Sequence, residues 1–148
     1  MSDLRELYQE IILDHNRQPR NFRKNAEATH TAEGYNPLCG DRISVYLTVE
    51  DGIVQDVSFQ GVGCAISTAS ASLMTDQMKG KTIDEVAALF EDMHTMLTTE
   101  ADLDIDRLGK LAVFSGVRAY PMRVKCATLC WHTLKAALDR QAEAVTTE

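Results

Sequence analysis

The sequence predicts an α+β fold, in which a small antiparallel three-stranded sheet has several helices packed on one face. Three observations lead to this prediction. Residues 42–50 alternate apolar and polar side chains, as a half-buried strand does. Asp51-Gly52 directly after it is a hairpin signal. Several later segments carry apolar residues at helical spacing. A chain of 148 residues can bury one core, so we expect a single domain over residues 1–148.

The hairpin after residue 50 decides how the two central strands face the core. The first strand has one apolar face, made of Ile43, Val45, Leu47 and Val49. A two-residue loop at Asp51-Gly52 would send Val57 and Phe59 of the second strand to the opposite face. A three-residue loop, 50–52, would pair Val45 with Val57 and keep all apolar residues on one side. We therefore expect the longer loop, with Gly52 left-handed in a bulge. The polar segment 27–34 is expected to be the third, edge strand.

Capping residues define several of the predicted helices. Residues 82–85 (TIDE) are a capping box, Gly80 ends the helix before it, and Pro121 occupies the first position of the last helix. The predicted helices cover residues 2–16, 65–79, 83–97, 104–114 and 121–140. The apolar residues that the helix after the capping box is expected to bury are Ile83, Val86, Ala87, Phe90, Met93 and Leu97.

Composition and charge exclude several classes of function. The fractions of apolar residues, 45%, and charged residues, 25%, are typical of a soluble globular protein. The net charge of −7 disfavours a nucleic-acid-binding protein, which usually has a basic face. No charged and apolar leader follows Met1, and no apolar run reaches the length of a membrane span. We therefore expect a cytoplasmic protein that contacts neither membrane nor nucleic acid. Thiols stay reduced there, so the four cysteines are expected to be ligands, nucleophiles or core residues.

Cys39 and Asp41 lie two residues apart in the turn NPLCGD, residues 36–41. Gly40 between them lets the backbone bend, so the thiol and the carboxylate can point toward one centre. A polar Gly-Asp turn is also an unfavourable place to bury a thiol as a hydrophobic side chain. Because both residue types are ligands of zinc, we interpret the pair as metal ligands.

The other cysteines are single, and two of them fit more than one interpretation. Cys64 follows Gly-Val-Gly and begins a helix, where the helix N-terminus favours a thiolate. Cys126 lies early in the last helix, close in sequence to Arg123 and Lys125, whose charges have the same effect. Without a CxxC pair, burial of each thiol as a small hydrophobic side chain is an equal alternative. Cys130 belongs to an apolar helical row and is predicted to be a core residue.

Four motifs occur in order: LYQEIILDHNRQPRN at 7–21, NPLCGD at 36–41, GVGCAIS at 61–67 and RVKCATL at 123–129. Together they resemble the U-type iron–sulfur cluster assembly family, which includes the IscU, SufU and NifU N-terminal proteins, over nearly the whole chain. Within that family the chain is similar to the SufU branch. Lys125 stands where the IscU branch has a His directly before the last ligand cysteine. Residues 103–121 also look like the extra stretch of SufU-type members between their second and third cysteines.

The resemblance implies a site and an activity. The site would be a tightly bound zinc ion, Zn²⁺, held by Cys39, Asp41, Cys64 and Cys126. The activity would be that of a zinc-dependent sulfurtransferase, which accepts persulfide sulfur from a SufS-type cysteine desulfurase and serves downstream SUF assembly proteins. Cys39 is implied as the sulfur acceptor. We expect Arg123 to steer the desulfurase or to stabilise the leaving thiolate, with a surface ion pair as the alternative.

Two other functions fit the same residues. The cysteines could hold a transient iron–sulfur cluster, which would make the protein an assembly scaffold. A purely structural zinc adaptor would bind a partner without doing chemistry. Lys125 and the stretch at 103–121 favour sulfur transfer over the scaffold.

Overall fold

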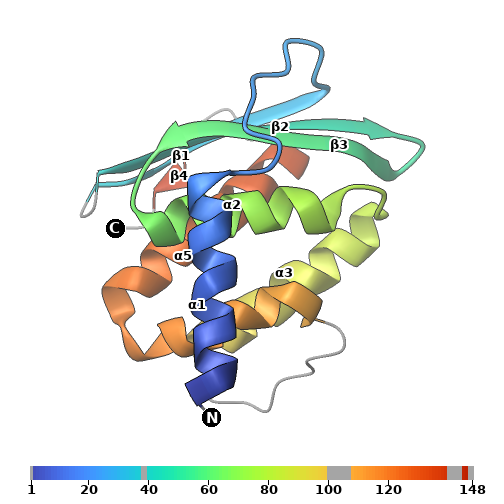
Figure 1. Cartoon of the computed structure of the whole chain (residues 1–148). Coiled ribbons are helices and arrows are strands. Elements are labelled where there is room, and N and C mark those ends of the chain that lie inside the picture. Colours follow the sequence, from blue (N-terminus) through green and yellow to red (C-terminus); the bar gives the residue numbers. More distant parts are fainter. Residues whose placement is uncertain (1, 38–39, 100–107, 140–144, 147–148) are drawn as a thin grey trace.

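The structure is a computed structural model that describes residues 2–37, 40–99, 108–139 and 145–146, and its sheet is covered on one face by helices (Figure 1). The elements in chain order are α1 Ser2–Arg17, β1 His30–Asn36, β2 Asp41–Glu50, β3 Ile53–Val62, α2 Ala65–Met78, α3 Ile83–Thr98, the 3-10 helix η1 Gly109–Ala119, α5 Pro121–Leu138 and β4 Val145–Thr146. The predicted α+β fold, with three antiparallel strands and helices on one face, is confirmed.

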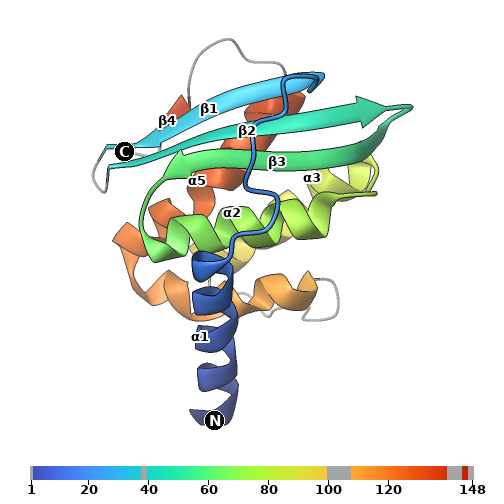
Figure 2. The same ribbon diagram turned by 45° about the horizontal axis from the view of Figure 1, so that its top comes forward.

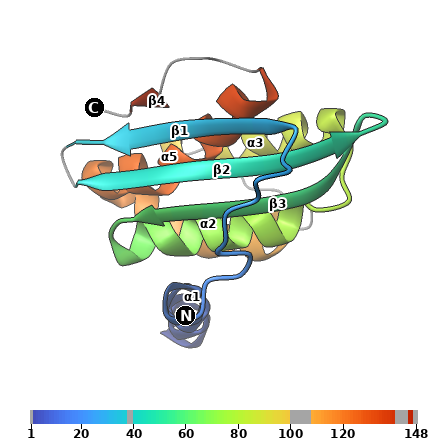
Figure 3. The same ribbon diagram turned by 90° about the horizontal axis from the view of Figure 1, so that it is seen from above.

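The sheet has the strand order β3-β2-β1-β4 (Figure 3). The three predicted strands pair antiparallel, and the two-residue strand β4, which was not predicted, adds a short parallel pairing beside β1. The first strand lies at His30–Asn36 instead of 27–34. Its limits follow from pairing with β2, which extends to the pair Asn36 and Asp41 at the end of the ladder.

The β2–β3 hairpin differs from the prediction in its loop and in its register but not in its apolar face. Val45 pairs with Phe59 instead of Val57, and Val57 pairs with Leu47. The loop is the two-residue turn Asp51-Gly52, with φ angles of 55° and 75°, and Val49 pairs with Val54. Positive φ at both central residues is the requirement of a type I′ turn, whose twist matches that of the strands. The register then shifts, leaving Gln55 as an extra residue in β3. This bulge returns the apolar residues that follow it to the core side. The buried residues of β3 include Val54, Val57 and Phe59.

The helices pack beneath the sheet, with α5 against β1 and β2 and with α2 against β3 (Figure 2). Helix α1 packs on α2 at the side of this layer (Figure 3). Gly34 of β1 allows the close approach of α5, because a Cβ atom there would lie 2.2 Å from Thr133 Oγ1 and 3.0 Å from Leu129 Cδ1. The position of α5 relative to the sheet is thereby set. Among the described residues, none of the helices has the length and apolarity that crossing a membrane requires.

The predicted helix ends are largely those of the structure. Thr82 and Glu85 form the expected capping box, and Gly80 follows α2 with a φ angle of 83°. In α3, however, Ile83 and Ala87 are exposed, and the buried residues are Val86, Phe90, Met93, Met96 and Leu97. In its described part, the helix predicted at 104–114 is the 3-10 helix η1, which begins at Gly109 and extends to Ala119. The left-handed φ angle of 55° at this glycine is incompatible with a continuous α-helix.

A buried hydrogen bond connects helix α1 to helix α2. His15 is 4% exposed, and its Nδ1 lies 2.7 Å from Ser72 Oγ. The backbone N–H of Arg20, after the end of α1, donates to the same oxygen at 2.8 Å. Burial lowers the pKa of His15, which favours the neutral ring that this contact accommodates. His15 therefore has a structural role in holding α1 in place.

Candidate metal centre

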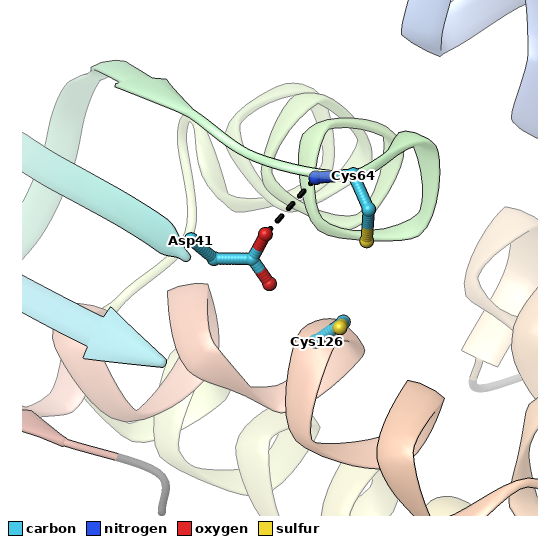
Figure 4. Close-up of side chains that lie close together, drawn as sticks. All are labelled: Asp41, Cys64 and Cys126. Atoms are coloured by element: carbon cyan, nitrogen blue, oxygen red, sulfur yellow. Dashed lines mark hydrogen bonds between the residues drawn. The ribbon is translucent and has the colours of Figure 1, made fainter. Parts of the chain in front are cut away.

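Three side chains that are far apart in the sequence meet beside the end of the β1–β2 ladder. Asp41, Cys64 and Cys126 each offer one donor atom, and these atoms all lie within 4.8 Å of one another. Asp41 is the first residue of β2, Cys64 immediately precedes α2, and Cys126 lies in the second turn of α5. The carboxylate and both sulfur atoms point into the same space (Figure 4).

Asp41 is a carboxylate on the apolar face of the sheet. It has the same strand parity as the core residue Ile43, and it is 1% exposed. The backbone N–H of Cys64 donates to Asp41 Oδ1 at 3.0 Å, which ties the start of β2 to the start of α2. Burying a carboxylate is costly unless it is paired, hydrogen-bonded or bound to a metal. The hydrogen bond from Cys64 offsets part of this cost, and a bound metal ion would offset more of it.

Cys64 is the N-cap residue of α2. Its backbone is extended, and its Sγ accepts a hydrogen bond from the N–H of Ser67 at 3.4 Å. Of the two described site thiols, Cys64 is exposed and Cys126 is buried. Solvent and small partners can therefore reach the site from the side of Cys64.

Asn36 is a site residue that sequence reasoning missed. Its Nδ2 lies 3.5 Å from Asp41 Oδ2 and 3.6 Å from Cys126 Sγ. The side chain is completely buried, and it faces Asp41 because the two residues are cross-strand partners. The predicted first strand ended at residue 34, which left Asn36 in the loop. If the predicted strand had been extended by two residues, the alternation of its side chains would have placed Asn36 beside the site.

The donor set and its spacing fit a zinc ion. Thiolate and carboxylate groups are common zinc ligands, and donor atoms around a tetrahedral zinc lie about 3.5–3.8 Å apart, given Zn–S bonds of about 2.3 Å. Donor atoms within 4.8 Å of one another need to approach by at most about 1.3 Å, which side-chain rotation can supply. The three described residues thus fit a zinc site that has room for one further ligand.

The other predicted site residues fall into different environments. Cys39 lies outside the described residues. Cys130 is in the core, 1% exposed, and burial raises the pKa of its thiol to about 12, so it is neutral and unreactive near pH 7. Arg123 is exposed, with its guanidinium 4.8 Å from the ring centre of Tyr120. It has no ion pair with any described carboxylate.

A groove of about 1060 Å³ leads to the two described thiols. One wall is α1, the opposite wall is η1, and Cys64 and Cys126 lie along it. The lining is mostly apolar, with Ile12 and Val117 among its members, and Arg123 is its only cationic residue among the described ones.

The comparisons with known proteins agree with this fold. The family model described as the NifU-like N terminal domain matches residues 7–127. The chain is 42% identical over 134 residues to the iron–sulfur cluster assembly scaffold protein IscU of Thermotoga maritima, covering 90% of this chain and 94% of the relative. It is 39% identical over 143 residues to the zinc-dependent sulfurtransferase SufU of Bacillus subtilis, covering 95% of each.

A solved structure has the same fold. It is a proposed iron–sulfur cluster assembly scaffold protein for the SUF system from Fervidobacterium islandicum, with a TM-score of 0.83 and 37% identity. The match covers 87% of this chain and 94% of that one. The chain therefore belongs to the NifU-like N-terminal domain family of iron–sulfur cluster assembly scaffold proteins, together with its IscU and SufU relatives.

Proposed function

We propose that this chain acts as a single domain, residues 1–148, and is a zinc-dependent sulfurtransferase of the cytoplasm. Its sulfur donor would be the persulfide of a SufS-type cysteine desulfurase, and its sulfur would pass to downstream SUF assembly proteins. The observation that carries the proposal is the convergence of Asp41, Cys64 and Cys126 within 4.8 Å. The similarity to the Bacillus subtilis SufU over 95% of both chains supports the same function.

The three described residues would hold the ion together with Cys39, giving three thiolates and one carboxylate. When bound, zinc keeps its thiol ligands deprotonated and protects them from oxidation. Cys64 and Cys126 are attached to helices, whereas Cys39 lies in the sequence between the end of β1 and the start of β2. Cys39 is therefore the ligand best suited to leave the site and react.

The transfer step is an exchange between a thiolate and a persulfide. The sulfur of Cys39 attacks the outer sulfur of the donor persulfide and forms a new S–S bond. The S–S bond of the donor breaks at the same time, and the donor cysteine leaves as a thiolate. Cys39 then carries the persulfide, and no external oxidant or reductant is consumed.

Arg123 is placed to assist this step. It lies in the apolar groove beside Cys64 and Cys126, exposed and held against Tyr120. A guanidinium at this position would attract the developing charge of the leaving thiolate. Because Arg123 has no ion pair with any described carboxylate, its charge remains available for this role.

A scaffold function is the second candidate, because the Thermotoga maritima relative at 42% identity is named a scaffold protein. The same cysteines can ligate iron in a cluster. Lys125 directly before Cys126 favours sulfur transfer, since it supplies no additional ligand such as histidine. Metal analysis with a visible spectrum separates the two functions. A colourless protein with one zinc per chain supports transfer, and a brown iron-containing protein supports the scaffold.

Desulfurase turnover tests the proposal directly. We expect the zinc-loaded wild-type protein to accelerate cysteine turnover by a SufS-type desulfurase by about tenfold, which corresponds to about 1.4 kcal/mol of barrier. Cys39→Ser should remove the acceleration, because it removes the attacking sulfur. Cys130→Ala is the matched control and should keep it, since Cys130 lies in the core. Equal turnover with and without wild-type protein would refute the proposed function.

Gly63→Ala should weaken zinc binding without a change in any ligand. A Cβ atom at Gly63 would lie 2.7 Å from Asp41 Oδ1 and 3.2 Å from Ser67 Cβ, so the carboxylate must move. Because the added methyl group displaces the Asp41 carboxylate, the zinc affinity should fall about tenfold or more. Chelator competition measures this change. Gly116→Ala is the control, because a Cβ atom there would meet nothing within 4 Å. Unchanged affinity in Gly63→Ala would contradict the proposed part of Asp41 in the site.

A further inference from the structure

We propose that Asn36 is a positioning residue, which holds two of the zinc ligands by hydrogen bonds and keeps them directed at the metal. The inference rests on the proposed zinc site. The amide group of Asn36 lies between Asp41 and Cys126, with Nδ2 3.5 Å from Asp41 Oδ2 and 3.6 Å from Cys126 Sγ. An amide nitrogen carries two hydrogens, so it can donate to both groups at once.

The two hydrogen-bond donors around Asp41 face different oxygens of its carboxylate. Oδ1 accepts the backbone N–H of Cys64 at 3.0 Å, and Oδ2 faces the amide of Asn36. Rotation of the carboxylate would break one bond or both. Asn36 itself has little freedom, because it is completely buried and is the cross-strand partner of Asp41. The ligand orientation is thus set by the register of the β1–β2 ladder.

The fold alone does not account for an asparagine here. Its Oδ1 is buried and has no hydrogen-bond partner among the described residues. An unsatisfied buried carbonyl is unfavourable, and an apolar side chain of the same shape would avoid that penalty. Two hydrogen bonds from Nδ2, to Asp41 and to Cys126, offset this penalty. Such hydrogen bonds are strongest when the acceptor is anionic. Asp41 and Cys126 are anionic when they bind a metal.

The consequence concerns the moment at which Cys39 leaves the site. Three ligands then remain, and Asn36 contacts two of them, Asp41 and Cys126. Hydrogen bonds from the surroundings fix the orientation of metal ligands and commonly contribute strongly to affinity. Asn36 would therefore help to retain the ion during sulfur transfer without being a ligand itself.

The test is the zinc affinity of purified variants, measured by competition with a chromogenic chelator. Asn36→Ala and the shape-conserving Asn36→Leu should both lower the affinity about 10- to 100-fold. Ser58→Ala is the matched control, because Ser58 is also buried in the sheet with an unsatisfied oxygen but lies opposite Tyr46 on β2 and is not one of the converging side chains. It should bind zinc as the wild type does. Cobalt-substituted Asn36→Leu should also show shifted visible bands, since these report the ligand geometry.

The possible results separate this inference from the proposed function. If Asn36→Leu keeps wild-type zinc affinity and cobalt bands while only its thermal midpoint changes, Asn36 is purely structural and the inference is wrong. A wild-type protein with no measurable affinity for zinc would overturn it too. If the variants lose affinity but wild-type protein does not accelerate a desulfurase, the inference stands and the sulfurtransferase function fails.

Discussion

Asp41→Ala is expected to lower the zinc affinity by at least about 100-fold, or about 2.7 kcal/mol, because it removes one of four ligands from a site of high total binding energy. Chelator competition measures this loss. The thermal midpoint of the metal-free variant should stay close to that of the metal-free wild type, because two effects oppose each other. The substitution removes a carboxylate that is 1% exposed, but it also leaves the N–H of Cys64 and the amide of Asn36 without this acceptor.

Asp56→Ala is the matched control for this carboxylate. Asp56 lies on β3 and pairs with Arg23 and Lys79 at the surface, away from the three converging side chains. Its removal should leave the zinc affinity unchanged. Wild-type affinity in Asp41→Ala would exclude the carboxylate from the ligand set and leave the thiols as the only described donors.

Removal of zinc should lower the thermal midpoint of the wild-type protein by about 10 °C. Free zinc at 1,000 times its dissociation constant stabilises the folded state by about 4 kcal/mol, and a chain of this size changes by about 2–4 °C for each kcal/mol. The structural reason is that the site joins β2, the start of α2 and α5, through Asp41, Cys64 and Cys126. Differential scanning calorimetry with and without a chelator measures the shift.

The variant Cys126→Ala controls for direct effects of the chelator. It lacks a buried ligand, so its thermal midpoint should not respond to zinc or to the chelator. An equal midpoint for zinc-loaded and metal-free wild-type protein would mean that the ion, if bound, does not link these elements. The zinc site would then have no structural role.

The β2–β3 hairpin illustrates how far pattern reasoning reaches. Alternation correctly predicted that the apolar residues of both strands share one face. It did not predict how, because a three-residue loop and a two-residue loop with a bulge satisfy the same parity. The structure has the turn Asp51-Gly52 and an extra residue, Gln55, in β3. The choice depends on strand twist and on contacts with the helices below, which no local pattern contains.

The proposed site illustrates the same division. Turn chemistry singled out Cys39 and Asp41, and the motif resemblance added Cys64 and Cys126. Asn36 was missed because its importance arises from its cross-strand position opposite Asp41. Likewise, Ile83 and Ala87 fit the apolar row of α3 by spacing but are exposed, because burial depends on which side of the helix meets η1 and α5.

By itself the sequence determined the α+β class, most helix ends, the apolar face of the hairpin and the family resemblance. These features are encoded locally, in alternation, caps and short motifs. Only the tertiary structure decided that Asp41, Cys64 and Cys126 come within 4.8 Å, that Asn36 lies between two of them, and that a groove between α1 and η1 leads to the thiols. These are contacts between residues up to 90 positions apart, and they exist only once α5 has packed against the sheet.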